Sequence, residues 1–241
     1  MGSAERRERE RRQTKTAILD AARSIMSERG FEGLTMRAVA DRIEYTAAAL
    51  YKHFSDREDL VRELCAHDFY EFTQALRSRP GALHFDPKDP YAQLRAIAHG
   101  YVEFAMGHPE QYRVMFMSPV PLEPNVVGKG NPESDAYAVL ELAVEAAQAR
   151  GCVPGLDRQL VAQTAWATMH GVVSLEISHL CAKKRSVAFA PLAERVRLAL
   201  ESIISGMESV AHDRLRLSGK SKPTLKTNKN SQPSRRLTRP R

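Results

Sequence analysis

The 241-residue sequence has three cysteines, few aromatic residues and no long apolar run, and each scarcity excludes a class of protein. Cys65, Cys152 and Cys181 are an odd number at wide spacing and form no CxxC pair, so we expect neither a disulfide framework nor a zinc site. No apolar run is long enough to span a bilayer, and charge dominates residues 5–12, so we expect no transmembrane helix and no secretory signal. These absences favour a cytoplasmic protein.

Motifs for catalysis and cofactor binding are also missing from the sequence. The eight histidines form no HxxxH or HxxE spacing with a plausible partner, and no GxSxG, P-loop or GxGxxG sequence occurs. We therefore expect no enzyme, no cofactor and no metal ion.

Positive charge is concentrated at the two ends of the chain. Residues 214–241 contain ten Lys or Arg and no acid, which leaves 26 basic and 29 acidic residues in the rest. The Ser, Lys, Arg, Pro and Asn composition after His212 predicts a basic disordered tail over 213–241. Residues 1–13 mix five arginines with three glutamates. This arm is either a solvated helix extension or a contact with phosphate or the minor groove, and both can hold.

Apolar residues recur at helical spacing and no alternation with a period of two appears, so we expect an all-α fold of about nine helices. Gly30 is placed to end the first helix, and the Ser55–Glu58 capping box to begin the fourth. The expected helices are 14–29, two within 35–54, one from the capping box to about Ser78, one from Asp89-Pro90, a short one within 109–116, one from Asn131-Pro132 to Gly151, one over 157–182, and one from Pro191 to about His212.

The stretch 35–54 predicts two short helices joined by a tight turn. Thr35 can cap the first helix and Thr46 the second, because each hydroxyl can accept a bond from an unpaired backbone N–H. Leu50 and Phe54 lie four residues apart and must pack against a third helix, since such short helices are unstable alone. The opposite face suits a helix lying in the DNA major groove.

The residues Leu50-Tyr51-x-His53-Phe54, with Thr35-x-Arg37 upstream and Asp56-Arg57-x-x-Leu60 downstream, resemble the DNA-binding domain of TetR-type bacterial repressors. The resemblance covers about residues 14–64 and implies an N-terminal helix-turn-helix domain. It departs from the family at Glu44, where the family usually has a Gly in a left-handed conformation. Either Glu44 takes that conformation at a cost of about 1–2 kcal/mol, or the turn has a different shape.

The resemblance also implies DNA-contacting positions. Arg37 is expected to reach a guanine edge or a phosphate. Ala47 and Ala48 offer only methyl groups, which either contact thymine or merely allow close approach, so DNA shape would carry more of the specificity. His53 is expected either to contact DNA or to pack beside Phe54. The predicted DNA-binding residues are Thr35, Arg37, Thr46, Ala47, Ala48, Tyr51, Lys52, His53 and Arg57.

Further along, Trp166-x-x-x-His170-Gly171-x-x-x-Leu175 resembles the Trp-His-Gly signature of a TetR-type C-terminal domain. Tyr101-x-x-Phe104-Ala105 and His108-Pro109-Glu110-x-Tyr112-x-x-Met115-Phe116 add to this resemblance, which implies a dimeric regulatory domain, taken here as 65–212. Trp166 and His170 share a helix face and either line an effector cavity or belong to the core, and Gly171 is expected to permit close helix–helix approach. The predicted cavity residues are Tyr101, Phe104, Met115, Trp166, Met169 and His170.

These patterns predict a homodimeric transcription regulator, a repressor that binds a near-palindromic double-stranded DNA operator and is released by a small-molecule effector. The dimer is expected to form through the last two long helices, with no membrane involved. Two alternatives remain: a constitutive DNA-binding protein without an effector, and a helical ligand-binding or adaptor protein.

Overall fold

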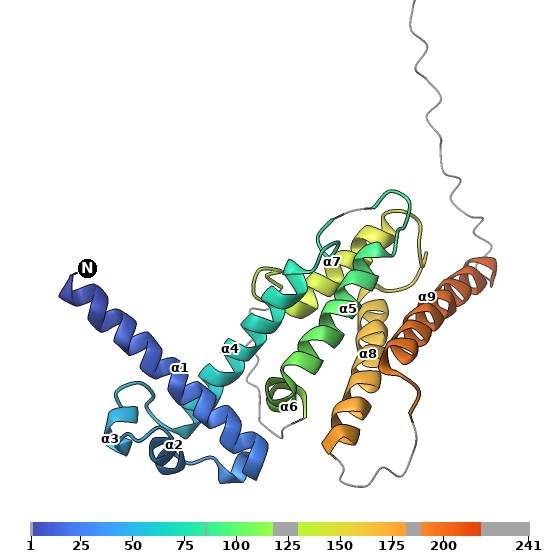
Figure 1. The fold of residues 1–241 in the computed structure, drawn as a ribbon. Coiled ribbons are helices and arrows are strands. Elements are labelled where there is room, and N and C mark those ends of the chain that lie inside the picture. The colour runs from blue at the N-terminus through green and yellow to red at the C-terminus, as the bar shows by residue number, and fades with distance from the viewer. Residues whose placement is uncertain (1, 85, 118–129, 182–188, 218–241) are drawn as a thin grey trace, which may run out of the picture.

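The computed structural model describes residues 2–84, 86–117, 130–181 and 189–217, with the backbone alone for residues 179–181. All regular secondary structure in these ranges is helical, which confirms the predicted all-α fold (Figure 1). The elements are α1 (Ser3–Arg29), the short 3-10 helix η1 (Phe31–Gly33), α2 (Met36–Arg42), α3 (Ala47–Leu50), α4 (Arg57–Ser78), α5 (Ala92–Gly107), α6 (Pro109–Phe116), α7 (Ala136–Gln148), α8 (Arg158–Cys181) and α9 (Leu192–Leu217).

The N-terminal domain is built from α1 to α3 and the first half of α4. Leu50 and Phe54 are fully buried against Ile18 of α1 and Leu60 and Leu64 of α4, as members of one apolar cluster. This burial holds the two short helices that would be unstable alone, as the sequence predicts.

Threonine hydroxyls cap both short helices, as predicted. Thr35 Oγ1 accepts a hydrogen bond from the Ala38 N–H at 3.1 Å, and Thr46 Oγ1 accepts one from the Ala49 N–H at 3.2 Å. Each bond satisfies one of the backbone donors that a helix start leaves unpaired. The caps therefore fix where α2 and α3 begin.

The turn between α2 and α3 takes the left-handed conformation at Glu44, whose φ is 58°. The Tyr45 N–H then donates to the Ala40 carbonyl at 2.9 Å and closes the turn. The turn therefore takes the left-handed conformation that the TetR-type resemblance implies, with Glu44 in place of a glycine and at a conformational cost.

We expect Glu44→Gly to raise the free energy of unfolding by about 0.5–1 kcal/mol, because glycine removes the left-handed strain but gains entropy in the unfolded chain. Urea titration followed by circular dichroism measures the change. The matched control is Asp41→Gly, inside α2. This substitution should lower the free energy of unfolding by about 1 kcal/mol, because glycine is unfavourable within a helix. A lower stability for Glu44→Gly would show that the side chain, not the strain, decides this position.

Three internal helix starts differ from the prediction, and at each of them an aspartate accepts a backbone bond: Asp56 and Asp135 cap their helices, while Asp89 closes a turn before α5. Asp56 accepts from the Asp59 N–H at 2.7 Å, and Asp59 in turn accepts from the Ser55 N–H at 2.9 Å, so the predicted Ser55–Glu58 box is wrong. Asp135 accepts from the Tyr137 N–H at 2.9 Å and starts α7 later than predicted. Asp89 accepts from the Tyr91 N–H at 2.9 Å within a turn, so α5 begins only at Ala92.

The two terminal helices are longer than predicted. Helix α1 begins at Ser3, so the charged arm is a continuous, exposed extension of the first helix (Figure 1). Helix α9 runs to Leu217 because Ala211 is buried and Leu215 is half-buried, which continues its apolar face. The prediction of disorder is therefore wrong for residues 213–217, and the rest of the predicted tail lies outside the described residues.

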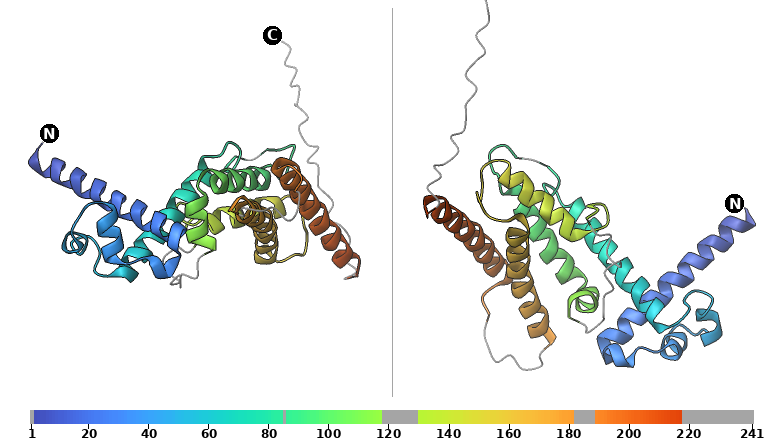
Figure 2. Two further views of the ribbon diagram at one scale, coloured as in Figure 1. Left: turned by 60° about the horizontal axis from the view of Figure 1, so that its bottom comes forward. Right: turned by 180° about the vertical axis from the view of Figure 1, so that it is seen from behind.

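The C-terminal body consists of α5 to α9 around a second apolar cluster, to which the second half of α4 contributes Phe72 and Leu76. Helix α4 thus runs from one domain into the other, and the predicted boundary at residue 64 falls inside it (Figure 2). Helix α6 joins the domains as well, because Val114 belongs to the N-terminal cluster while Tyr112 and Met115 belong to the C-terminal one. No helix in the described part of the chain is long and apolar enough to cross a membrane.

Candidate DNA-binding surface and effector cavity

The surface of α2, the turn and α3 carries most of the predicted DNA-binding side chains. Arg37, Lys52 and Tyr51 are exposed, and the Tyr51 side chain is 54% accessible. Helix α3 itself is only four residues long, but the His53 N–H still donates to the Leu50 carbonyl at 2.8 Å. The backbone hydrogen bonds therefore continue from α3 through the turn at residues 51–53. The segment 46–53 exposes its outer face to solvent, and its inner face packs through buried Leu50. Thr35, Thr46 and Ala48 are also exposed, while Ala47 is half-buried.

A cluster of positive charge lies beside the end of α3. The Lys15 Nζ of α1 is 5.8 Å from the centre of the Phe54 ring and 2.6 Å from Glu63 Oε2. Burial, together with the nearby charges of Arg11, Lys15 and Lys52, lowers the pKa of His53. The half-buried His53 ring also lies 6.5 Å from the Phe54 ring, which agrees with the packing alternative, while its DNA contact stays a prediction. Sequence reasoning did not single out Lys15, although its i, i+4 spacing from Arg11 was visible.

Arg57 contacts the protein itself in the free chain. Its Nη2 donates to the Phe31 carbonyl at 2.6 Å, and its guanidinium lies 4.1 Å from the centre of the Phe31 ring. The Arg57 Nε is buried and has no hydrogen-bond partner among the described residues. Arg57 therefore connects η1 to the start of α4, and its predicted DNA contact stays a prediction.

A cavity of about 620 Å³ lies in the C-terminal body between α4, α5, α6, α7, α8 and α9. Five of the six predicted cavity residues line it, namely Tyr101, Met115, Trp166, Met169 and His170. Phe104 does not line it, in contrast to the prediction. Its ring packs 5.1 Å from Phe72 and stacks 4.7 Å from His108, on the side toward α4 and α6.

Sequence reasoning missed the contribution of α9 to this cavity. Leu200, Ile203, Ile204 and Met207 line it from α9. The broad apolar face of this helix suggested a dimer interface, but a large part of that face is covered within the chain. The sequence does not distinguish a face that covers a cavity from one that meets a partner.

Two polar side chains that line the cavity, Tyr101 and His170, form a cluster with the fully buried Tyr112. The hydroxyl of Tyr112 lies 2.7 Å from His170 Nδ1 and 3.0 Å from the Tyr101 hydroxyl, which is itself 3.1 Å from His170 Nδ1. Burial lowers the pKa of His170 and raises the pKa of Tyr101 to about 12. Burial raises the pKa of Tyr112 as well. The cluster is therefore uncharged near pH 7.

A buried ion pair joins the two domains. Asp68 of α4 is fully buried and accepts bonds from Arg23 of α1 at 2.6 and 3.2 Å. Gln111 of α6 donates to Asp68 at 3.2 Å and to Glu71 at 2.6 Å. His67, Asp68 and Glu71 bring possible ligand atoms within 4.8 Å of one another, but the bonds from Arg23 and Gln111 already occupy Asp68 and disfavour a metal ion there.

Both domains match models of one protein family. Residues 18–64 match the model described as bacterial regulatory proteins, tetR family, and residues 94–200 match the tetracyclin repressor-like C-terminal domain. The chain belongs to the tetR family. The predicted family is thereby confirmed, while the Trp-His-Gly subclass stays a prediction.

Relatives of this TetR-family protein are named as regulators. The HTH-type transcriptional regulator UidR of Escherichia coli K12 is 33% identical over 72 residues, which cover 30% of this chain and 37% of UidR. The HTH-type transcriptional repressor KstR of Mycobacterium tuberculosis is 38% identical over 69 residues, which cover 29% of each chain. The match thus spans about a third of each relative. A solved structure of a protein with unknown function from Rhodococcus sp. RHA1 has a TM-score of 0.62 and 27% identity, covering 80% of this chain and 95% of that one.

Proposed function

We propose that this protein is a cytoplasmic, homodimeric transcriptional repressor that binds a near-palindromic DNA operator. The observation that carries the proposal is the exposed outer face of the segment 46–53. This face presents Tyr51 and Lys52 to solvent, while Leu50 on the inner face is buried. A recognition helix in the major groove needs this combination of an outer polar face and a fixed inner face. The name of KstR, a repressor whose similarity to this chain lies in a 69-residue stretch, favours repression.

The DNA contacts divide into two kinds in this proposal. Arg37 stands in the first turn of α2 and reads a base edge, while Tyr51, Lys52 and the cationic cluster around His53 bind phosphates. Ala47 and Ala48 allow the helix to approach the bases closely.

The partner protomer binds through α8 and α9. Helix α9 exposes an uncharged line at i, i+4 spacing, namely Leu198, Ser202, Gly206 and Val210. Helix α8 exposes Ala167 and Leu175 around Gly171. Among the described residues, a Cβ at Gly171 would meet no atom of another helix within 4 Å, so the close approach predicted there is left for a partner. Two-fold symmetry then places the half-sites one or two helical turns apart.

The effector acts on the DNA-binding domains through α6. This helix lines the cavity with Met115 and Phe116, reaches the N-terminal core with Val114 and contacts the buried ion pair with Gln111. In one conformation of the dimer, the spacing between its two DNA-binding domains does not fit the operator. A molecule that binds this conformation more tightly lowers operator affinity by linkage.

Selection of duplexes from a random library by the full chain tests the proposal, with the DNA next to its own gene as a second source of sites. We expect a two-fold symmetric sequence. Arg37→Ala should weaken binding to that sequence by about tenfold or more and relax the preference at one position in each half-site. No enrichment over random DNA would instead favour a constitutive DNA-binding protein.

We expect Tyr51→Phe to weaken binding to all duplexes similarly, by about two- to tenfold, because one hydrogen bond to phosphate is lost. Fluorescence anisotropy with specific and random duplexes measures both affinities. Tyr70→Phe, equally exposed on α4, is the matched control and should change neither. A loss confined to one base position would overturn the phosphate role of Tyr51.

A further inference from the structure

We infer that the cavity takes a neutral, largely apolar molecule with one oxygen that accepts a hydrogen bond from the Tyr101–Tyr112–His170 cluster. Carboxylates and phosphates are excluded. This inference rests on the proposed function, since it names the chemical class of the proposed effector.

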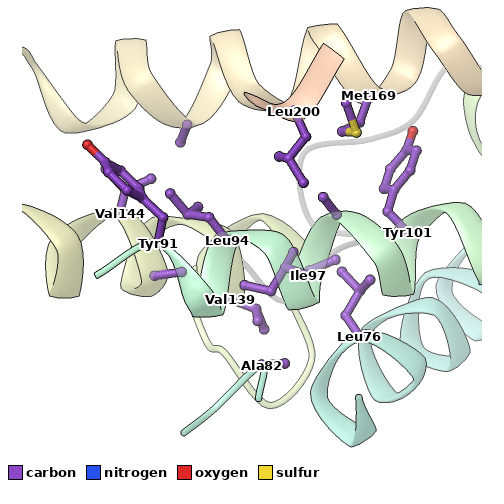
Figure 3. Packing of buried hydrophobic residues seen from close by; sticks show 14 of the residues in the cluster. Leu76, Ala82, Tyr91, Leu94, Ile97, Tyr101, Val139, Val144, Met169 and Leu200 are labelled. Carbon is purple, nitrogen blue, oxygen red and sulfur yellow. The ribbon is translucent and has the colours of Figure 1, made fainter. Parts of the chain in front are cut away.

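The walls of the cavity select for apolar surface. Its volume of about 620 Å³ is in the range of small-molecule sites. Leu94 and Ile97 of α5 face Leu200 of α9 across it, and Met169 of α8 lies beside them (Figure 3). A bound molecule would therefore be surrounded mainly by aliphatic and aromatic side chains.

Charge on the ligand would find no partner in this wall. No Lys or Arg is among the described residues that line the cavity. The one carboxylate, Asp135, already accepts bonds from the Tyr137 N–H and the Gly130 N–H, each at 2.9 Å. His170 is neutral, as argued from its burial. Because an unpaired buried charge is strongly unfavourable, an anion is rejected by the cavity.

The polar cluster leaves one hydrogen-bond donor for the ligand. Tyr101, Tyr112 and neutral His170 carry three protons between them, and their mutual contacts of 2.7–3.1 Å use two in either tautomer of the ring. The remaining proton is on His170 Nε2 or on a tyrosine hydroxyl, and it can be donated to a hydroxyl, carbonyl or ether oxygen. Because Tyr112 belongs to α6, the cluster connects the ligand to the helix that reaches the DNA-binding domain.

The charge preference is tested with two dyes on the full chain without DNA. N-phenyl-1-naphthylamine is neutral, and 8-anilinonaphthalene-1-sulfonate has the same scaffold with an anionic group. Trp166 is the only tryptophan of the chain, lines the cavity and is 40% exposed, so energy transfer from it reports dye bound in or near the cavity. We expect the neutral dye to bind at least tenfold more tightly. Equal or tighter binding of the sulfonate, or no transfer from Trp166 to the neutral dye, would overturn the inference.

The oxygen contact is tested by displacing the neutral dye with 1-decanol or decanoate at pH 7.5. We expect decanol to compete at least tenfold better, and Tyr112→Phe or Tyr101→Phe to weaken decanol several-fold. Tyr137→Phe is the matched control, because Tyr137 also lines the cavity but its hydroxyl contacts the Gln159 carbonyl. Decanoate competing as well as decanol, or equal loss in all three variants, would contradict the inference.

The two proposals can fail separately in these measurements. If decanoate binds and releases operator DNA while decanol does neither, the ligand class is wrong and the repressor function stands. If decanol binds with the expected preference but leaves operator affinity unchanged, the class stands and the switch in the proposed function is wrong.

Discussion

Asp68→Ala is expected to lower the free energy of unfolding by about 3–5 kcal/mol, because it leaves the Arg23 guanidinium without its buried partner. The Arg23 side chain is only 11% exposed and Asp68 is fully buried, while Asp20, the carboxylate that Arg23 would keep, is 62% exposed. Urea titration measures the change. The control is Glu8→Ala, whose ion pair with Arg12 is exposed and should contribute less than about 1 kcal/mol. A loss below about 1 kcal/mol for Asp68→Ala would show that the pair does not hold the domains together.

The difference in the free energy of unfolding between wild type and Asp68→Ala depends on pH, because the groups of this ion pair titrate. Burial raises the pKa of Asp68, but hydrogen bonds and the charge of Arg23 outweigh burial, so the pKa lies below its usual value. The stabilisation is therefore present above about pH 4 and is lost as the pH falls through the lowered pKa. The nearby Asp68 carboxylate raises the pKa of His67, whose contribution is present below about pH 6.5 and is lost as the pH rises through the raised pKa.

Leu198→Arg is expected to dissociate the dimer and weaken operator binding by about 100-fold or more. Leu198 is 66% exposed in one chain and lies on the uncharged line of α9, so a charge there would be buried without a partner in the proposed interface. A single protomer would retain only half-site contacts. Sedimentation velocity and anisotropy with the selected duplex measure the two effects.

The control for this variant is Leu83→Arg, which places the same charge at an exposed leucine between α4 and α5. It should leave mass and operator affinity unchanged. A Leu198→Arg protein that stays dimeric and binds operator normally would place the interface elsewhere.

Local signals in the sequence were enough to predict most of the fold. The capping hydroxyls of Thr35 and Thr46 act within three residues, whereas the sequence left the shape of the turn at Glu44 open and the structure shows it to be left-handed. Helix starts were missed where two caps compete, as at Ser55 and Asp56, because either residue can accept the same kind of bond. Such a choice depends on packing that the sequence does not display.

Contacts between distant residues could not be predicted in the same way. Arg23 and Asp68 are 45 residues apart, and neither stands in a motif that signals burial. Arg57 matches a DNA-contacting position of the family, yet it binds the Phe31 carbonyl in the free chain. Tyr112 was part of a motif, but its contact with His170 was not predicted, because the two residues are 58 positions apart and lie on different helices. In each of these cases the contact depends on where the side chain points in the folded chain, which the sequence does not display.

In the proposed dimer, two copies of the chain present residues 46–53 together to one symmetric duplex. Anisotropy titration of the full chain with the selected duplex, and with the same duplex after one half-site is scrambled, tests this most directly. We predict that scrambling one half-site weakens binding by about 100-fold or more, since the two domains bind as a unit. Equal affinity for the intact and the half-scrambled duplex would contradict the account.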